Sequence, residues 1–102
     1  MNETTISMMK DGAILINASR GPVVDSEALA QALNSGKLAA AGGDVYEMEP
    51  PIPDSHPLLS AKNTILTPHV AFLSAESMEK RAEIVFRNLR EWTQGHQINT
   101  IV

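Results

Sequence analysis

The chain has 102 residues, enough for one small domain, with 43% hydrophobic and 20% charged residues as in an ordinary globular protein. Its net charge of −4 argues against a nucleic-acid partner, and no hydrophobic run approaches the ~20 residues of a membrane span. It has no cysteine and no signal-peptide pattern in its first residues, so we expect a cytoplasmic protein without disulfide or thiolate chemistry.

The first elements are a short helix and a buried strand. Residues 2–9 predict the helix, because Asn2 can cap its amino end and two apolar residues can face a core, Ile6 and Met9. Residues 13–17 read AILIN, a continuous apolar run between polar residues. Such a run is typical of a parallel strand buried on both faces.

A helix and a second strand follow. Asp25 or Ser26 can cap a helix that ends near Ser35, and Gly36 suits its carboxyl end. One apolar stripe recurs at helical spacing along it: Ala28, Leu29, Ala32 and Leu33. Residues 38–45 then predict a second buried strand.

The last third of the chain contains a proline-rich loop, a strand and the longest helix. Residues 46–61 hold four prolines, which predicts a loop without helix or central strand, with His56 either facing solvent or bonded within the loop. Residues 63–67 predict a third strand, and residues 74–94 a helix capped by Ser74. The apolar stripe of that helix predicts a core or subunit contact: Met78, Ala82, Val85, Leu89 and Trp92.

This alternation of strands and helices predicts an α/β fold, a partial Rossmann-like domain of about three parallel strands with flanking helices. So small a sheet would leave an apolar edge and face exposed, so we also expect a homodimer or higher oligomer. In open parallel sheets, ligands bind beyond the carboxyl ends of the strands.

Four chemically suited residues follow or flank those strand ends. Arg20 is either a carboxylate-binding cation or a partner in a surface salt bridge, and Asp44 is either a capping acid or a cofactor contact. His69 can carry a proton in either direction near neutral pH. A neighbouring carboxylate such as Glu49 would favour the protonated imidazole and orient the ring. We find no metal-ligand spacing among the three histidines.

Three ordered motifs resemble the D-isomer-specific 2-hydroxyacid dehydrogenases, which include glycerate (hydroxypyruvate), phosphoglycerate and D-lactate dehydrogenases. They are MKDGAILINASRGPVVDSEALAQAL, GDVYEMEP and NTILTPHVAF, followed by the terminal helix. The resemblance covers nearly the whole chain. It implies binding of NAD or NADP and of a small 2-keto or 2-hydroxy carboxylic acid.

The resemblance also implies roles for single residues. Arg20, in N-x-x-R-G, is similar to the arginine that holds the substrate carboxylate, and His69, in T-P-H, to the acid that protonates the keto oxygen. Glu49, before Pro50, matches the partner of that histidine. Cofactor binding would involve Arg20, His69 and three further positions: Asp44, near the nicotinamide, and Ala18 and Ala71, whose backbone would line the cofactor.

The family's glycine-rich turn and its separate substrate domain have no counterpart in these 102 residues. We therefore expect residues 1–102 to be the C-terminal half of an NAD(P)-binding Rossmann domain. This fragment would carry the catalytic set and be inactive alone. The alternative is a non-enzymatic remnant that serves as an oligomerisation or regulatory module.

Overall fold

The computed structural model describes residues 1–49 and 51–101, so Pro50 and Val102 lie outside the described residues. The chain divides into two compact units, residues 1–71 and residues 72–102, and each is described by itself. The first unit contains all the strands and every residue singled out above for chemistry.

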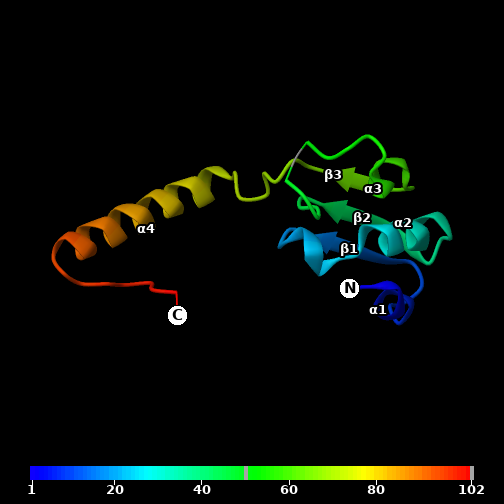
Figure 1. Cartoon of the computed structure of the whole chain (residues 1–102), viewed down its shortest axis with the longest axis horizontal. Helices are drawn as coiled ribbons and strands as arrows, with labels where there is room; N and C mark the ends of the chain where they lie inside the picture. The colour runs from blue at the N-terminus through cyan, green and yellow to red at the C-terminus, as the bar shows by residue number, and fades with distance from the viewer. Residues whose placement is uncertain (50, 102) are drawn as a thin grey trace. The chain divides into compact units, whose positions relative to one another are not determined.

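The first unit is a parallel sheet with short helices. Its elements are α1 (Glu3–Ser7), β1 (Ala13–Asn17), a 3-10 helix η1 (Gly21–Val23), α2 (Ser26–Asn34), β2 (Leu38–Gly43), α3 (Pro57–Ser60) and β3 (Thr64–Leu66). The strands pair in parallel in the order β1-β2-β3 (Figure 1). The predicted α/β, Rossmann-like architecture is confirmed, with β2 ending at Gly43 rather than at residue 45.

Helix caps and the core follow the sequence pattern closely. Asn2 caps α1, and the Asp25 carboxylate accepts the Ala28 N–H at the start of α2. Gly36 adopts a φ of +82° just after α2, a conformation that favours glycine. The α2 stripe is buried as predicted, in a core where the most buried large side chains are Ile6 and Leu38.

The prediction that β1 is buried on both faces is wrong within the described residues. Leu15 and Asn17 are buried, whereas Ile14 is 64% and Ile16 76% exposed. Ile65, paired through β2 on the same face, is also 76% exposed. α2 contacts β2 and α3 contacts β3 from the other side of the sheet, and α1 packs on α2, so this apolar face has no cover from the described part of unit 1.

The prediction of a helix-free loop at residues 46–61 is also wrong, because α3 lies within it. Pro57 occupies the first turn of α3, where the absent N–H of proline costs no hydrogen bond. His56 caps this helix and is buried, so its solvent-facing alternative is wrong and its bonding within the loop is confirmed.

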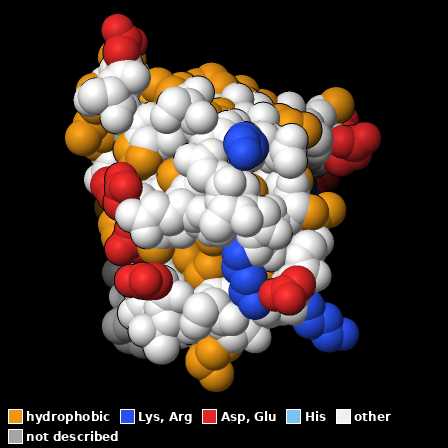
Figure 2. Space-filling view, turned by 90° about the vertical axis from the view of Figure 1, so that its right-hand side faces the viewer, with side chains coloured by type: hydrophobic (Ala, Val, Ile, Leu, Met, Phe, Trp, Pro, Cys, Tyr) orange, Lys and Arg blue, Asp and Glu red, His pale blue; other side chains and the backbone are white. Residues whose placement is uncertain are grey.

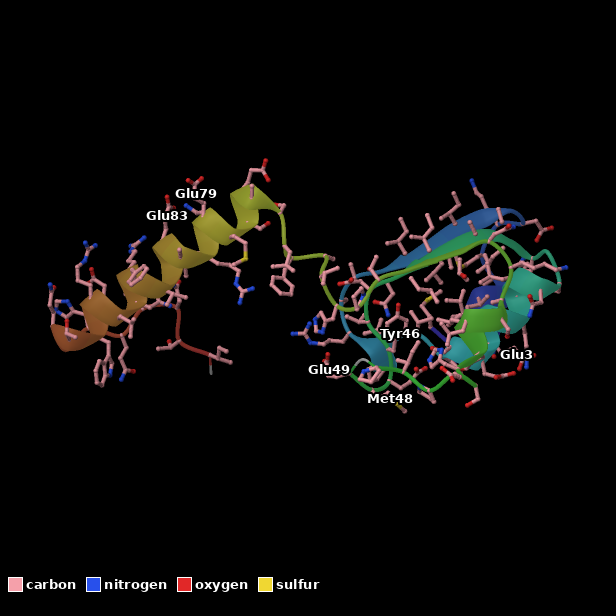
Figure 3. The ribbon with its side chains drawn as sticks, turned by 90° about the horizontal axis from the view of Figure 1, so that it is seen from above. Glu3, Tyr46, Met48, Glu49, Glu79 and Glu83 are labelled. Atoms are coloured by element: carbon pink, nitrogen blue, oxygen red, sulfur yellow. The ribbon has the colours of Figure 1, made fainter. Side chains whose placement is uncertain are left out.

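The second unit consists of α4 (Ala75–Thr93) and the tail after it, with Ser74 capping the helix as predicted. No described residue of α4 is buried, and Glu79 and Glu83 project from one side of it (Figure 3). Its apolar stripe therefore forms no core within this unit, and its role as a subunit contact stays a prediction. Across the described residues, no helix is both long and apolar enough to cross a membrane.

The amino ends of the strands form a face of mixed character. Figure 2 shows acidic, basic and hydrophobic side chains interspersed there. Lys37 and Asp11 form an ion pair on this side of unit 1, with 2.6 Å between Nζ and Oδ1. The predicted site residues lie instead at the carboxyl ends of the strands, or on the loops that follow them.

Candidate active site

The loop after β1 presents Arg20. Asn17, buried at the end of the strand, accepts the Ser19 N–H at 3.2 Å and donates its amide to the Arg20 carbonyl at 3.0 Å. The Arg20 guanidinium is exposed and donates to the Ser19 carbonyl at 2.7 Å. Sequence reasoning missed Asn17 as the organiser of this loop, although a polar residue ending a buried strand signals such a role.

Gly21 lets this loop pass directly against the segment after β2. A Cβ at Gly21 would lie 1.6 Å from the Tyr46 carbonyl oxygen, far inside any real contact. Only glycine permits so close a backbone approach. The loop that carries Arg20 is thereby held against the loop that leads to Glu49.

Asp44 fastens the loop after β3. One oxygen of its carboxylate accepts the Thr67 hydroxyl and, at 2.8 Å, the Val70 N–H; the other accepts the Ala71 N–H at 2.8 Å. Burial acts to raise the pKa of Asp44, but these hydrogen bonds and the charge of His69 outweigh it and hold the pKa below its ordinary 3.8. The geometry thus gives Asp44 the capping role that the sequence left open.

The structure brings His69 and Glu49 together across 20 residues of chain. His69 Nδ1 lies 2.9 Å from Glu49 Oε2, with the side chains 31% and 78% exposed. His69 has a φ of +59°, which is uncommon for a residue with a Cβ and which occurs preferentially at functional sites. The loop geometry set by Asp44 holds the ring where Glu49 can reach it.

A shallow pocket of about 180 Å³ lies beside these residues on the exposed face of the sheet. Its lining includes all three further positions expected to bind the cofactor: Ala18, Asp44 and Ala71. Most of the remaining lining is apolar or glycine, with polar groups from Asn17 and Thr67. A mainly apolar wall with a few polar atoms fits a planar ring that bears an amide, such as nicotinamide.

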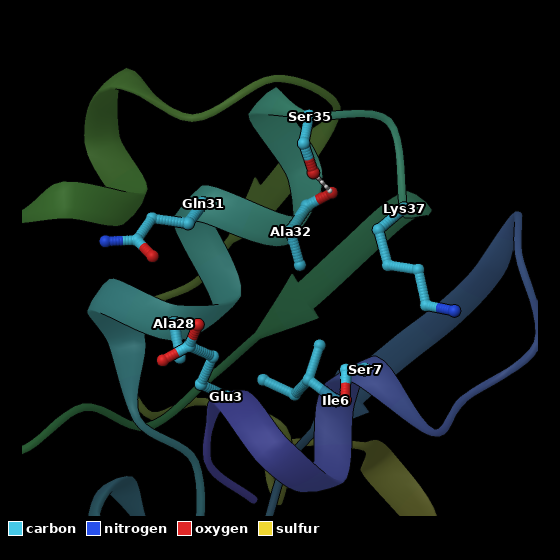
Figure 4. A pocket seen from close by; sticks show the side chains of 8 residues that line it. All are labelled: Glu3, Ile6, Ser7, Ala28, Gln31, Ala32, Ser35 and Lys37. Atoms are coloured by element: carbon cyan, nitrogen blue, oxygen red, sulfur yellow. Dashed lines mark hydrogen bonds between the residues drawn. The ribbon is translucent and has the colours of Figure 1, made fainter.

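The cavity between α1 and α2 does not belong to this site. It has a volume of about 290 Å³ and is lined by residues such as Ile6, Ala28 and Ala32 (Figure 4). None of the residues proposed for chemistry lines it. Its one basic group, Lys37, is already paired with Asp11.

The predicted set is therefore assembled in two parts. Glu49 pairs with His69, and Asp44 bonds the backbone beside His69. Arg20 stands apart: among the described residues, no carboxylate lies within ion-pair distance of its guanidinium. Its salt-bridge alternative thus has no support in the described part of the chain.

The family is decided by residues 1–71. They match the model of the D-isomer specific 2-hydroxyacid dehydrogenase, NAD binding domain. The chain belongs to this family. The predicted resemblance is confirmed, and the match ends where the first compact unit ends.

Relatives of this dehydrogenase family are similar over nearly the whole chain. A hydroxypyruvate reductase of Blautia hydrogenotrophica is 46% identical over 101 residues, which cover 99% of this chain and 31% of that protein. A glyoxylate reductase of Thermofilum pendens is 47% identical over 102 residues, 100% of this chain and 30% of that protein. The chain therefore spans about a third of the length of these relatives.

Solved structures of similar enzymes share this fold. An acyclic imino acid reductase in complex with NADPH and D-Arg superposes with a TM-score of 0.87 at 30% identity, covering 98% of this chain and 31% of that one. A D-lactate dehydrogenase with NAD+ from Lactobacillus jensenii gives 0.79 at 32% identity, covering 100% of this chain and 34% of that one. Both structures hold a nicotinamide cofactor in chains that include this fold.

Proposed function

We propose that this chain is the segment of an NAD(P)-dependent D-2-hydroxyacid dehydrogenase that carries its catalytic residues. The observation that carries the proposal is the His69–Glu49 pair, with 2.9 Å between Nδ1 and Oε2, at the carboxyl edge of a parallel sheet. A histidine oriented by a carboxylate is a common arrangement for moving a proton to or from substrate oxygen.

In this proposal His69 protonates the keto oxygen during reduction and removes the proton in the reverse direction. Glu49 accepts the Nδ1 proton and orients the ring, and Nε2 would exchange the proton with the substrate oxygen. The left-handed backbone of His69, with a φ of +59°, sets the direction in which its side chain leaves the loop. The nicotinamide, when bound, supplies or accepts the hydride.

Arg20 would hold the carboxylate of the 2-keto or 2-hydroxy acid. Its guanidinium is exposed and no described carboxylate competes for it, and beyond the bond from one terminal nitrogen to the Ser19 carbonyl it keeps further N–H groups for an anion. The pocket beside Ala18, Asp44 and Ala71 would receive the nicotinamide of NAD or NADP. Arg20 and His69 would border the same ring from the substrate side.

The 102-residue chain alone should bind NAD(H) weakly and turn over little substrate, because it contains no glycine-rich turn for the pyrophosphate. We propose that residues 1–102 contribute the C-terminal half of a Rossmann domain to a longer cytoplasmic enzyme. The exposed apolar side chains on the sheet and on α4 favour self-association, as a homodimer or higher oligomer. The same surfaces favour the alternative role of an oligomerisation module.

A chimera tests the proposal. Residues 1–102 replace the matching segment of the Blautia hydrogenotrophica hydroxypyruvate reductase, which is 46% identical over this stretch. NADH oxidation is then followed with hydroxypyruvate as substrate. Activity in the chimera supports the enzymatic assignment. A folded chimera that binds NADH but reduces nothing would leave the non-enzymatic alternative standing.

Substitutions in the active chimera separate the roles. Arg20→Lys loses the planar fork and should mainly raise KM, with Arg90→Lys on α4 as the matched control. His69→Gln removes the proton carrier and should lower kcat by roughly 10²–10⁴-fold. Glu49→Gln keeps an acceptor but removes the charge, so kcat should fall less than in His69→Gln. Equal kcat in parent and His69→Gln would refute the assignment of His69.

A further inference from the structure

Tyr46 ties the Glu49 loop to the ends of two strands. Its hydroxyl lies 2.8 Å from the Gly43 carbonyl oxygen and 3.0 Å from that of Thr67. Burial and the nearby Asp44 charge raise the pKa of Tyr46, so the phenol stays protonated and can donate. The start of the loop is therefore fixed to β2 and to the residue after β3.

Glu47 fastens the next part of the loop. Its Oε1 accepts the Ser26 N–H at 3.2 Å, and its Oε2 lies 3.1 Å from His56 Nε2. Burial acts to raise the pKa of Glu47, but hydrogen bonds from Ser26, from its own backbone and from His56 outweigh it, so the pKa lies below its ordinary value. The ionised carboxylate thus bridges the start of α2 and the residue that caps α3.

His56 is held in one tautomer by this arrangement. It is 7% exposed, and its Nδ1 accepts the Leu58 N–H at 3.4 Å. Because a backbone N–H can only donate, Nδ1 carries no proton, and Nε2–H donates to Glu47. The ring also meets Tyr46 edge to face, with the ring centroids 5.5 Å apart. The buried rings of Tyr46 and His56 thus join the half-exposed Glu47 carboxylate in one cluster.

His69 holds the opposite tautomer. An ionised carboxylate can only accept, so Nδ1 of His69 carries the proton that it shares with Glu49. Among the described residues, the hydrogen-bond partner recorded for the Glu49 carboxylate is this imidazole. Because 78% of the Glu49 side chain is exposed, little packing holds it. Its position therefore depends mainly on the course of the backbone, which Glu47 anchors two residues earlier. Figure 3 shows Tyr46, Met48 and Glu49 at one end of the unit.

We propose that Glu47 and His56 are a positioning pair that holds the Glu49 loop so that Glu49 reaches His69 Nδ1. The inference rests on the proposed roles of Glu49 and His69, and it assigns Glu47 and His56 no contact with substrate. An exposed loop has few packing contacts to hold it, and the hydrogen bonds of Glu47 and His56 to the first residues of α2 and α3 hold this one instead. Loss of the pair should release Glu49 and remove the tautomer preference of His69.

The test is ¹⁵N NMR of the histidine rings in the full chain, which requires no bound cofactor. His56→Asn keeps a side-chain oxygen to cap α3 but is too short to reach Glu47. Glu47→Gln offers one acceptor oxygen where two donors now bind, so it loses one of the two bonds. His96→Asn is the matched control, because His96 lies in the other unit with 70% of its side chain exposed.

In the parent we expect His56 as the Nε2–H tautomer and His69 as the Nδ1–H tautomer. In the folded His56→Asn and Glu47→Gln chains, the Nδ1 signal of His69 should move toward that of a ring exchanging between both tautomers. His96→Asn should leave it unchanged.

Three results would overturn the proposal. The first is a parent His56 that carries its proton on Nδ1. The second is a His69 signal that stays unchanged in either folded variant. The third is the failure of both variants to fold, which would make the pair a support of the whole unit instead. Failure of the proposed function is separate, since an inactive chimera leaves these ring signals as they are.

Discussion

Replacing Asp44 with asparagine removes one of three hydrogen bonds at the site's most constrained loop. With its oxygen in place of Oδ1, asparagine can still accept from Thr67 and Val70. Its amide nitrogen then faces the Ala71 N–H, so a donor meets a donor. The loss of a hydrogen bond to a charged acceptor costs about 1.5–3 kcal/mol. For a unit of this size, the Tm should fall by about 10 °C.

The cost should depend on pH with a definite sign. Because the pKa of Asp44 is lower in the folded chain than its ordinary 3.8, the unfolded chain binds more protons in acid. The carboxylate therefore stabilises the fold fully above about pH 5, and this contribution is lost as the pH falls through the lowered pKa. Asparagine has no such contribution to lose. The difference in the free energy of unfolding between parent and Asp44→Asn should shrink below about pH 4.

The assay is urea unfolding followed by circular dichroism at pH 7 and at about pH 3.5. Asp54→Asn is the matched control, because Asp54 is an exposed acid on the loop before α3, and it should change the free energy of unfolding by less than about 0.5 kcal/mol. The reasoning is refuted if Asp44→Asn matches this control at pH 7. An Asp44→Asn deficit that grows in acid would refute the sign of the linkage.

Three further predictions follow from the contacts. Gly21→Ala should lower the free energy of unfolding by about 3 kcal/mol or more, because its Cβ would lie 1.6 Å from the Tyr46 carbonyl oxygen. The control is Gly42→Ala, whose Cβ makes only an ordinary contact of 3.6 Å, and equal unfolding curves for the two variants would contradict the prediction. Tyr46→Phe leaves the Gly43 and Thr67 carbonyls without the hydroxyl and should cost about 1–2 kcal/mol in urea unfolding, and an unchanged midpoint would speak against it. Sedimentation of the chain should show a dimer or larger species, and a monomer at high concentration would count against self-association.

Burial was the property that the sequence predicted least well. AILIN reads as a strand covered on both sides, but burial depends on what packs on the sheet, and the described helices of unit 1 pack on one face only. His56 is the opposite case: it is buried, although nothing in the sequence of a proline-rich loop indicates burial. Pro57 misled for a different reason, since proline excludes a helix interior but not a first turn.

Local features were determined by the sequence itself. Asn2, Asp25 and Ser74 cap their helices because a short polar side chain can satisfy the N–H groups of a first turn wherever that helix lies. The parallel direction of the strands brings the residues after each strand to one edge, which is why Arg20, Asp44 and His69 could be singled out from the strand ends before the family resemblance implied their roles.

Only the tertiary structure decided which partner each of these residues takes. Glu49 lies 20 residues from His69, and Asp44 lies 27 residues from the N–H that it accepts, so no local pattern could state either pairing. That Asp44 caps a loop depended on where the backbone of that distant loop passes. These hydrogen bonds are 2.8–2.9 Å long and need the donor and acceptor atoms at defined positions. The folded chain sets those positions, whereas the spacing of residues in the sequence does not.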